Sequence, residues 1–291
     1  MTLAQPLAVA DIELSSFWDF STTADLLSRD FVQQSLLAIV LLGLLGGLLG
    51  PLIVARQMSF AVHGVSELSV TGAAAALLLG VGINVGGVVG AVIAASVFGY
   101  MGNRARERDS VIGVVMAFGL GLGVLFLALY GSARTGFAML TGQVVSVGTD
   151  GLTAVAITTV VVLAVMAVIY RPLLFASLDP RLAAASGVPL RTLSVVFAVL
   201  MGLACAQGVQ IIGALLVMSL MITPAAAAAR LTANPTTAVI VSIVFAEVAA
   251  VGGLIMSLAP GLPVSVFVTT ISFVIYVICR WAGHRRQFVT R

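Results

Sequence analysis

Nine long apolar segments follow one another along the chain, and they decide the surroundings in which it can fold. Each approaches the roughly 20 apolar residues that a helix needs to cross the hydrocarbon core of a bilayer. They lie at residues 33–55, 58–80, 84–102, 111–130, 151–170, 190–206, 210–229, 236–258 and 263–280. Because 60% of the residues are hydrophobic and only 9% are charged, a water-soluble fold has too little polar surface to cover them. The sequence predicts an all-α, polytopic membrane helix bundle.

The positions of the arginines indicate the number of crossings. The segments at 84–102 and 190–206 are short for a spanning helix, which leaves eight crossings as the alternative to nine. With nine crossings and a cytoplasmic C-terminus, twelve arginines lie in cytoplasmic loops and only Arg29 and Arg134 lie outside. The twelve are Arg56, Arg104, Arg106, Arg108, Arg171, Arg181, Arg191, Arg230, Arg280, Arg285, Arg286 and Arg291. Eight crossings would break this alternation, so we expect about nine, with the N-terminus outside.

No long linker divides the chain, and we expect a single membrane domain. Residues 1–31 are predicted to form an extracytoplasmic N-terminal tail, residues 32–282 the transmembrane domain, and residues 283–291 a basic cytoplasmic tail. The formal net charge of +3 does not indicate nucleic-acid binding, because the arginines lie between apolar segments and form no stripe. The sequence contains no nucleophile elbow, HExxH motif or phosphate-binding loop, so we do not expect an enzyme.

The glycines of the first apolar segment predict close packing between helices. The sequence GLLGGLLG places Gly43 four residues before Gly47, and Gly46 four residues before Gly50. Small residues at this spacing let helix backbones approach closely in lipid. The pattern predicts a compact bundle and carries no information about a substrate.

Two ionisable side chains share one face of the second segment. Glu67 follows His63 by four residues, which places both on the same side of a helix. Ionisable groups inside a membrane helix are costly and are candidates for function. An imidazole and a carboxylate at this spacing can hold one divalent ion, since both are ligands of zinc and manganese. The alternative is a His–Glu hydrogen bond that only neutralises two buried groups. A second copy of the chain would raise two ligands to four.

Two further residues inside the apolar segments are candidates for a structural or gating role. Glu247 lies near the middle of the eighth segment without a basic neighbour there. It fits a protonated packing residue, a partner for a polar group on another helix, or a part of an ion path, and a structural or gating role is favoured. Pro224 follows Thr223 in the seventh segment, where proline frees a backbone carbonyl and predicts a kink.

A short helix is predicted between the fifth and sixth segments, on the cytoplasmic side. Asp179 and Pro180 are typical of a helix start, while Gly187 followed by Pro189 is typical of a helix end. The pattern predicts an amphipathic helix at about 179–187. Such a helix is either an ordinary interfacial element or a docking element for a cytoplasmic partner.

Four stretches together resemble the permeases of zinc, manganese and iron(II) ABC importers, over roughly residues 32–280. They are VARQMSFAVHGVSEL, DSVIGVVMAFGLGLGV, SLDPRLAAASGVP and VQIIGALLVMSLMITPAAAAARL. The first resembles the start of the family's second helix, and the third resembles the loop that docks on the ATPase. The fourth is similar to its seventh helix, including Gln210, Gly213, Pro224 and Arg230.

The resemblance implies a bacterial plasma-membrane importer without a cofactor of its own. Two permease copies would form a dimer, a cytoplasmic ABC ATPase would bind the ATP, and an extracytoplasmic binding protein would deliver the metal. Residues Asp179, Pro180, Ala183 and Gly187 match the docking loop and are the implied ATPase-coupling residues. Zinc is expected as the transported ion, manganese next and iron(II) third. A proton-coupled secondary transporter is the alternative, and co-purification of an ATPase discriminates between the two.

Three features of the sequence differ from the family pattern. The second helix of the family usually carries Asp and then His four residues later, whereas the order here is His63 and then Glu67. Thr71 stands where the family usually has Pro. Residues 262–265 depart from the usual Pro-Ser/Thr-Gly-Pro stretch. One imidazole and one carboxylate are kept, so His63 and Glu67 remain the implied ligands of the metal path.

Overall fold

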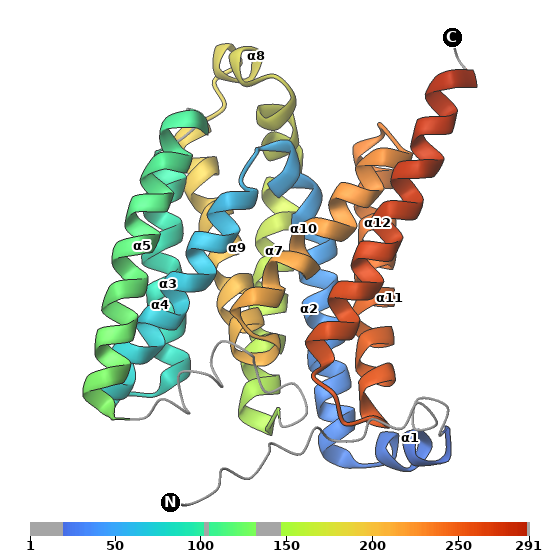
Figure 1. Cartoon of the computed structure of the whole chain (residues 1–291). Coiled ribbons are helices and arrows are strands. Elements are labelled where there is room, and N and C mark those ends of the chain that lie inside the picture. Colours follow the sequence, from blue (N-terminus) through green and yellow to red (C-terminus); the bar gives the residue numbers. More distant parts are fainter. Residues whose placement is uncertain (1–19, 102–104, 132–146, 290–291) are drawn as a thin grey trace, which may run out of the picture.

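A computed structural model describes residues 20–101, 105–131 and 147–289, and within these ranges the chain is helical with no strand (Figure 1). The helices are α1 (Phe20–Leu27), α2 (Asp30–Ala55), α3 (Ser59–Leu78), α4 (Ile83–Tyr100), α5 (Ala105–Tyr130), α7 (Thr149–Leu178), α8 (Pro180–Ala185), α9 (Leu190–Ile212), α10 (Ala214–Leu231), α11 (Pro235–Leu258) and α12 (Val264–Val289). The predicted all-α membrane bundle is confirmed.

Eight of the nine predicted apolar segments each correspond to one helix, and the segment at 210–229 is divided between α9 and α10. Eight of the helices in the described part of the chain are long and apolar enough to cross a membrane, whereas the apolar stretch of α10, Leu216–Leu231, is shorter. If only eight helices cross the membrane, the exception is therefore α10 and not one of the two segments that looked short in the sequence. Those two form α4, with 18 residues, and α9, with 23.

A glycine explains why α9 is longer and α10 shorter than the predicted segments. Gly213 is the single residue between the two helices, and its φ of 89° lies in the left-handed region. Glycine adopts this conformation without the steric cost that a β-carbon brings. The helix break therefore falls at Gly213, within the segment predicted at 210–229.

The two ends of the bundle carry different elements. Figure 1 shows α8 and the C-terminal end of α12 at one end, and α1 at the opposite end. The turn after α2 lies at the α8 end, because Arg56 bonds to Ser177 near the end of α7. The C-terminal end of α10 also lies there, since the backbone of Arg230 packs against Gly283. Three connections and the C-terminal end of α12, all with predicted cytoplasmic arginines, thus share one end, while the side of the membrane that this end faces remains a prediction.

The tails predicted around the membrane domain are partly helical. Residues 20–31 contain α1 and the start of α2, while the part of the tail at 1–19 lies outside the described residues. At the other end α12 continues to Val289, so most of the predicted basic tail at 283–291 extends a spanning helix.

The glycines of α2 bring two neighbouring helices into close contact. A β-carbon on Gly46 would lie 2.9 Å from the carbonyl oxygen of Leu220 on α10, and one on Gly47 would lie 2.7 Å from the backbone nitrogen of Ile243 on α11. Any larger side chain would push these backbones apart. The predicted small-residue packing is confirmed, with α10 on one side of α2 and α11 on the other.

Large apolar side chains cover the outside of the bundle. Phe118 on α5, Val168 on α7 and Phe273 on α12 are between 63% and 78% exposed. In water such a surface would aggregate, whereas in a bilayer the acyl chains of the lipid cover it.

Candidate functional site

His63 and Glu67 lie on α3, which packs against α4, α5, α9 and α10. Glu67 is only 5% exposed and His63 is half-buried. The two side chains interact electrostatically, as expected for residues one helical turn apart. The ring of Phe60 lies beside the imidazole, with 6.4 Å between the ring centroids. The helix therefore places both predicted ligands in one protected position.

One polar atom of each side chain is buried without a hydrogen-bond partner among the described residues. These atoms are Nδ1 of His63 and Oε2 of Glu67. Burying a polar atom unpaired costs about 1–3 kcal/mol, so such atoms call for an explanation. The His–Glu hydrogen bond considered from the sequence would have paired an atom of each residue, and no such bond is present. Both unpaired atoms are of the kind that coordinates a metal ion.

The described part of one chain brings too few ligands together for a complete tetrahedral site. No group of three or more His, Cys, Asp or Glu side chains near enough to share a metal ion occurs in the ranges described. Alone, His63 and Glu67 offer two side chains of the kind that bind a metal ion. A tetrahedral ion needs two further ligands from outside this part of the chain.

Two hydroxyl groups hold α3 against its neighbours next to the pair. The Thr71 hydroxyl lies 2.9 Å from the carbonyl oxygen of Gly119 on α5 and 3.2 Å from that of Glu67. Ser69 donates a 3.0 Å hydrogen bond to the carbonyl of Gly87 on α4. These contacts fix the rotation of α3 about its axis. These contacts between helices were hard to predict from the sequence, because a hydroxyl in an apolar helix usually bonds only within its own helix.

Glu247 lies elsewhere, at the contact between α11 and α2. A β-carbon on Gly43 would lie 2.9 Å from Oε1 of Glu247, so the carboxyl group rests on the glycine. The side chain is half-buried. The structure therefore does not bring Glu247 together with His63 and Glu67 as one cluster of ligands.

Pro224 is buried inside α10, which continues through it as one helix. Proline has no N–H group, so the carbonyl of Leu220, four residues earlier, loses its helical partner. This is the carbonyl against which Gly46 of α2 packs. The proline and the glycine thus meet at one weakened point of α10.

The predicted short helix between α7 and α9 is present as α8 (Pro180–Ala185), near the boundaries expected from the sequence. Oδ1 of Asp179 accepts hydrogen bonds from the backbone nitrogens of Arg181 and Leu182, at 3.0 and 2.9 Å. Gly187 has a φ of 80°, which ends the helix as predicted.

The orientation of α8 separates its residues into two groups. Ala183 is completely buried and faces the flanking helices of its own chain. Leu182 is 55% exposed, and Arg181 is also exposed. Leu182 was not predicted from the sequence, because an apolar residue is expected to face inward. Only the orientation of α8 in the structure shows which of its sides is exposed.

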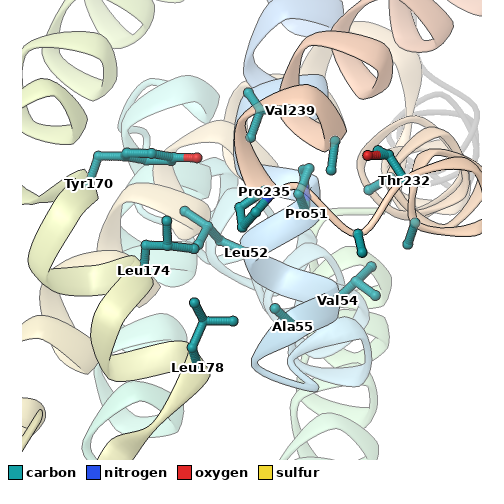
Figure 2. Close-up of a pocket in the computed structure, with 14 residues that line it drawn as sticks. Pro51, Leu52, Val54, Ala55, Tyr170, Leu174, Leu178, Thr232, Pro235 and Val239 are labelled. Carbon is teal, nitrogen blue, oxygen red and sulfur yellow. The ribbon is translucent and has the colours of Figure 1, made fainter.

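An apolar groove of about 210 Å³ lies between α2, α7, α10 and α11. Figure 2 shows Pro51 and Leu52 of α2 facing Tyr170 and Leu174 of α7 across it, with Pro235 of α11 beside them. None of its lining residues is a His, Cys, Asp or Glu. The groove has no ligands for a metal ion and is separate from the pair on α3.

Comparison with known proteins agrees with this arrangement. Residues 28–283 match the ABC 3 transport family. The chain belongs to that family. It is 28% identical over 269 residues to the manganese transport system membrane protein MntC of Halalkalibacterium halodurans, covering 91% of this chain and 92% of the relative. It is 30% identical to the manganese import system permease protein ScaB of Streptococcus parasanguinis, over 68% of this chain and 71% of the relative.

Two further similarities concern a zinc relative and a solved structure. The high-affinity zinc uptake system membrane protein ZnuB of Haemophilus influenzae is 26% identical over 78% of this chain and 88% of its own. The structure titled PsaBC from Streptococcus pneumoniae in complex with Fab has a TM-score of 0.80 and 24% identity, over 89% of this chain and 94% of that one. The predicted permease family and permease fold are confirmed, and the chain is an integral membrane permease.

Proposed function

We propose that this permease forms the path of an ATP-driven importer for a divalent transition metal. The observation that carries the proposal is the pair of unpaired buried atoms, His63 Nδ1 and Glu67 Oε2, on a spanning helix. A bound ion satisfies both atoms at once. A purely structural role for the pair leaves the cost of burying them without compensation.

Two copies of the permease complete the metal site in this proposal. A dimer with its axis beside α3 brings two imidazoles and two carboxylates together, one pair from each copy. Four ligands are the usual number for zinc, and water can add to them for manganese. The symmetric, isologous contact is the commonest arrangement of identical subunits.

We place manganese before zinc as the transported ion, which reverses the order expected from the sequence. The manganese transport protein MntC of Halalkalibacterium halodurans matches 91% of this chain, while the zinc relative matches 78%. Any site with these ligands binds zinc more tightly than manganese. Selection of manganese therefore requires geometry that favours a larger set of oxygen ligands, including water.

Energy and metal come from partners in this proposal. The exposed side of α8 docks on a cytoplasmic ABC ATPase, which binds all of the ATP, and Asp179, Pro180 and Gly187 shape the helix that docks. Ala183 contributes by seating α8 on its own chain. An extracytoplasmic protein delivers the ion at the opposite end, near α1. This arrangement gives the outside N-terminus and cytoplasmic C-terminus that the arginines predict.

Pro224 and Glu247 have supporting roles in the proposal. Both lie where α2 meets a neighbouring helix, Pro224 through the Leu220 carbonyl and Glu247 through Gly43. Alternating access requires helices to move against one another. A proline that removes a helical bond and a flexible carboxyl at a glycine contact are suited to such movement.

The test is metal uptake into proteoliposomes that hold the permease with its ATPase and binding protein. Wild type is compared with His63→Ala and Glu67→Ala for Mn²⁺, Zn²⁺ and Fe²⁺, and Ser96→Ala is the control because its hydroxyl bonds only within α4. We expect uptake of one ion to collapse in both ligand variants while the complex still assembles. Unchanged uptake in both would make the pair structural, and uptake without any ATPase would favour a secondary transporter.

A further inference from the structure

Arg56, at the end of α2, contacts both helices that flank α8. Its Nη1 donates a 3.2 Å hydrogen bond to the hydroxyl oxygen of Ser177 on α7. Its guanidinium carbon lies 5.7 Å from the centre of the Phe197 ring on α9, within the range of a cation–π interaction. Three segments distant in the sequence therefore meet at one side chain.

Both contacts lie close to α8 along the chain. Ser177 stands two residues before Asp179, the N-cap of α8. Its hydroxyl donates a 2.6 Å hydrogen bond to the Leu173 carbonyl, so its oxygen is held in place to accept from Arg56. Phe197 is fully buried on α9, the helix that follows α8. A displacement of α8 that is passed on to α7 or α9 therefore reaches a helix that carries one of the two groups held by Arg56.

On its other side, Arg56 is connected by a rigid turn to the helix of the proposed metal ligands. The Gln57 backbone has a φ of 54°, and the Met58 nitrogen donates to the Ile53 carbonyl at 2.9 Å. Met58 is 1% exposed, which anchors the turn in the core. The first residue of α3 is Ser59, and His63 follows one helical turn later, about 6 Å along the axis.

We infer that Arg56 is a positioning residue that transmits movement of α8 to the His63–Glu67 pair. The chain of contacts runs from α8 through Ser177 and Phe197 to Arg56, and from there through the turn at Met58 into α3. This inference rests on the proposed function, because it assigns α8 to ATPase docking and the pair to the metal. It adds a physical connection between α8 and the His63–Glu67 pair, which the proposed function does not include.

The chemistry of arginine suits this position and that of lysine does not. The planar guanidinium presents its edge to a hydrogen-bond acceptor while its face covers an aromatic ring. An ammonium group is a point charge with a strongly held hydration shell and cannot make both contacts in the same way. Arg56→Lys therefore keeps the positive charge at this end of the bundle but loses the combined contacts with Ser177 and Phe197. The variant thus separates the effect of charge from the effect of side-chain geometry.

The experiment measures how strongly metal-loaded binding protein stimulates ATP hydrolysis by the permease–ATPase complex in proteoliposomes. Variants are Arg56→Lys and Arg56→Met, with Arg171→Met as the control. Arg171 is an exposed arginine on α7, nearer to the same end than to the other. We expect both Arg56 variants to keep the bound ATPase and its unstimulated hydrolysis. Stimulation and uptake should fall by about tenfold or more, while Arg171→Met should behave as wild type.

A second set of variants tests whether the three residues act as one unit. Ser177→Ala and Phe197→Leu each remove one contact, and combining either with Arg56→Met should lower stimulation by less than the two single losses together. Stimulation that stays within about twofold of wild type in assembled Arg56 variants, or an equal loss in Arg171→Met, overturns the inference. If the Arg56 variants do not assemble, unchanged stimulation in Ser177→Ala plus Phe197→Leu overturns it instead. A wild-type complex that moves no metal marks a failure of the proposed function, not of this link.

Discussion

The Glu247 carboxyl group of α11 rests on Gly43 of α2, where a β-carbon would lie 2.9 Å from its Oε1. One turn further along α2, Gly47 packs against the backbone of Ile243. The same pair of helices thus touches through a flexible side chain at one glycine and through rigid backbone at the next. This difference predicts two different responses to the same substitution.

Gly43→Ala should be nearly neutral for stability, while Gly47→Ala should be destabilising. Replacing glycine by alanine inside a helix gains up to about 1 kcal/mol. At Gly43 the carboxyl group can rotate away, so the gain from alanine roughly offsets the cost of displacing that group. At Gly47 the helices must separate, and overpacking of this kind costs about 1–3 kcal/mol. Thermal unfolding of the purified permease in detergent checks the order of the two midpoints.

The partner variant Glu247→Ala provides the control for that comparison. Combined with each glycine variant, it should raise the thermal unfolding midpoint of Gly43→Ala and leave the midpoint of Gly47→Ala unchanged. Only Gly43 contacts the carboxyl group. An equal loss of stability in both glycine variants would mean that Glu247 is as rigid as backbone, and the interpretation of its flexible contact would be wrong.

Much of this fold could be predicted from the sequence because lipid imposes simple rules. Long apolar segments must become helices, since every backbone polar group needs a partner inside the bilayer. The GLLGGLLG stretch indicated close packing, and Asp179, Pro180 and Gly187 placed α8 nearly correctly. These signals are local: each depends on a few neighbouring residues and not on the partner helix.

The parts that the sequence did not reveal depend on distant contacts. The break at Gly213 was missed because apolar residues continue across it. The burial of Ala183 depends on how α8 lies on α7 and α9. The link from Arg56 to Ser177 joins residues 121 positions apart, which no spacing rule can anticipate. The pair on α3 was predicted, but its unpaired atoms were visible only in the structure.

In the proposed two-copy metal site, Glu67→His should shift the preference between manganese and zinc toward zinc. A dimer of this variant offers four imidazoles in place of two imidazoles and two carboxylates, and imidazole suits zinc while carboxylate suits manganese. Competitive uptake of the two ions in proteoliposomes measures the shift, which we expect to be about tenfold or more. His63→Glu, with carboxylates only, is the matched opposite and should shift the preference toward manganese. A change in the same direction in both would contradict a shared site.

Leu182 and Ala183 should respond in opposite ways, although they are neighbours on α8. Leu182 is 55% exposed and Ala183 is fully buried. Leu182→Ala should weaken binding of the ATPase and leave permease stability unchanged, since the side chain has little to lose within its own chain. Ala183→Leu should lower the unfolding midpoint through overpacking. Co-purification of the ATPase and unfolding of the isolated permease separate the two effects, and lower stability in Leu182→Ala would contradict the assigned docking face.

Thr71→Val should loosen α5 from the bundle and disturb transport, although it leaves the side chains of His63 and Glu67 unchanged. The Thr71 hydroxyl reaches the Gly119 carbonyl at 2.9 Å, and the main contact of α5 is with α3. Loss of one such bond costs about 1 kcal/mol, whereas Thr71→Ser keeps the hydroxyl and should match wild type. Hydrogen exchange of the α5 amides in detergent measures the loosening directly, and uptake should fall in parallel because α5 no longer holds α3 in its rotation. Equal exchange in the Val and Ser variants would show that packing of Gly119 and Gly123 around Thr71 holds α5 without the hydrogen bond.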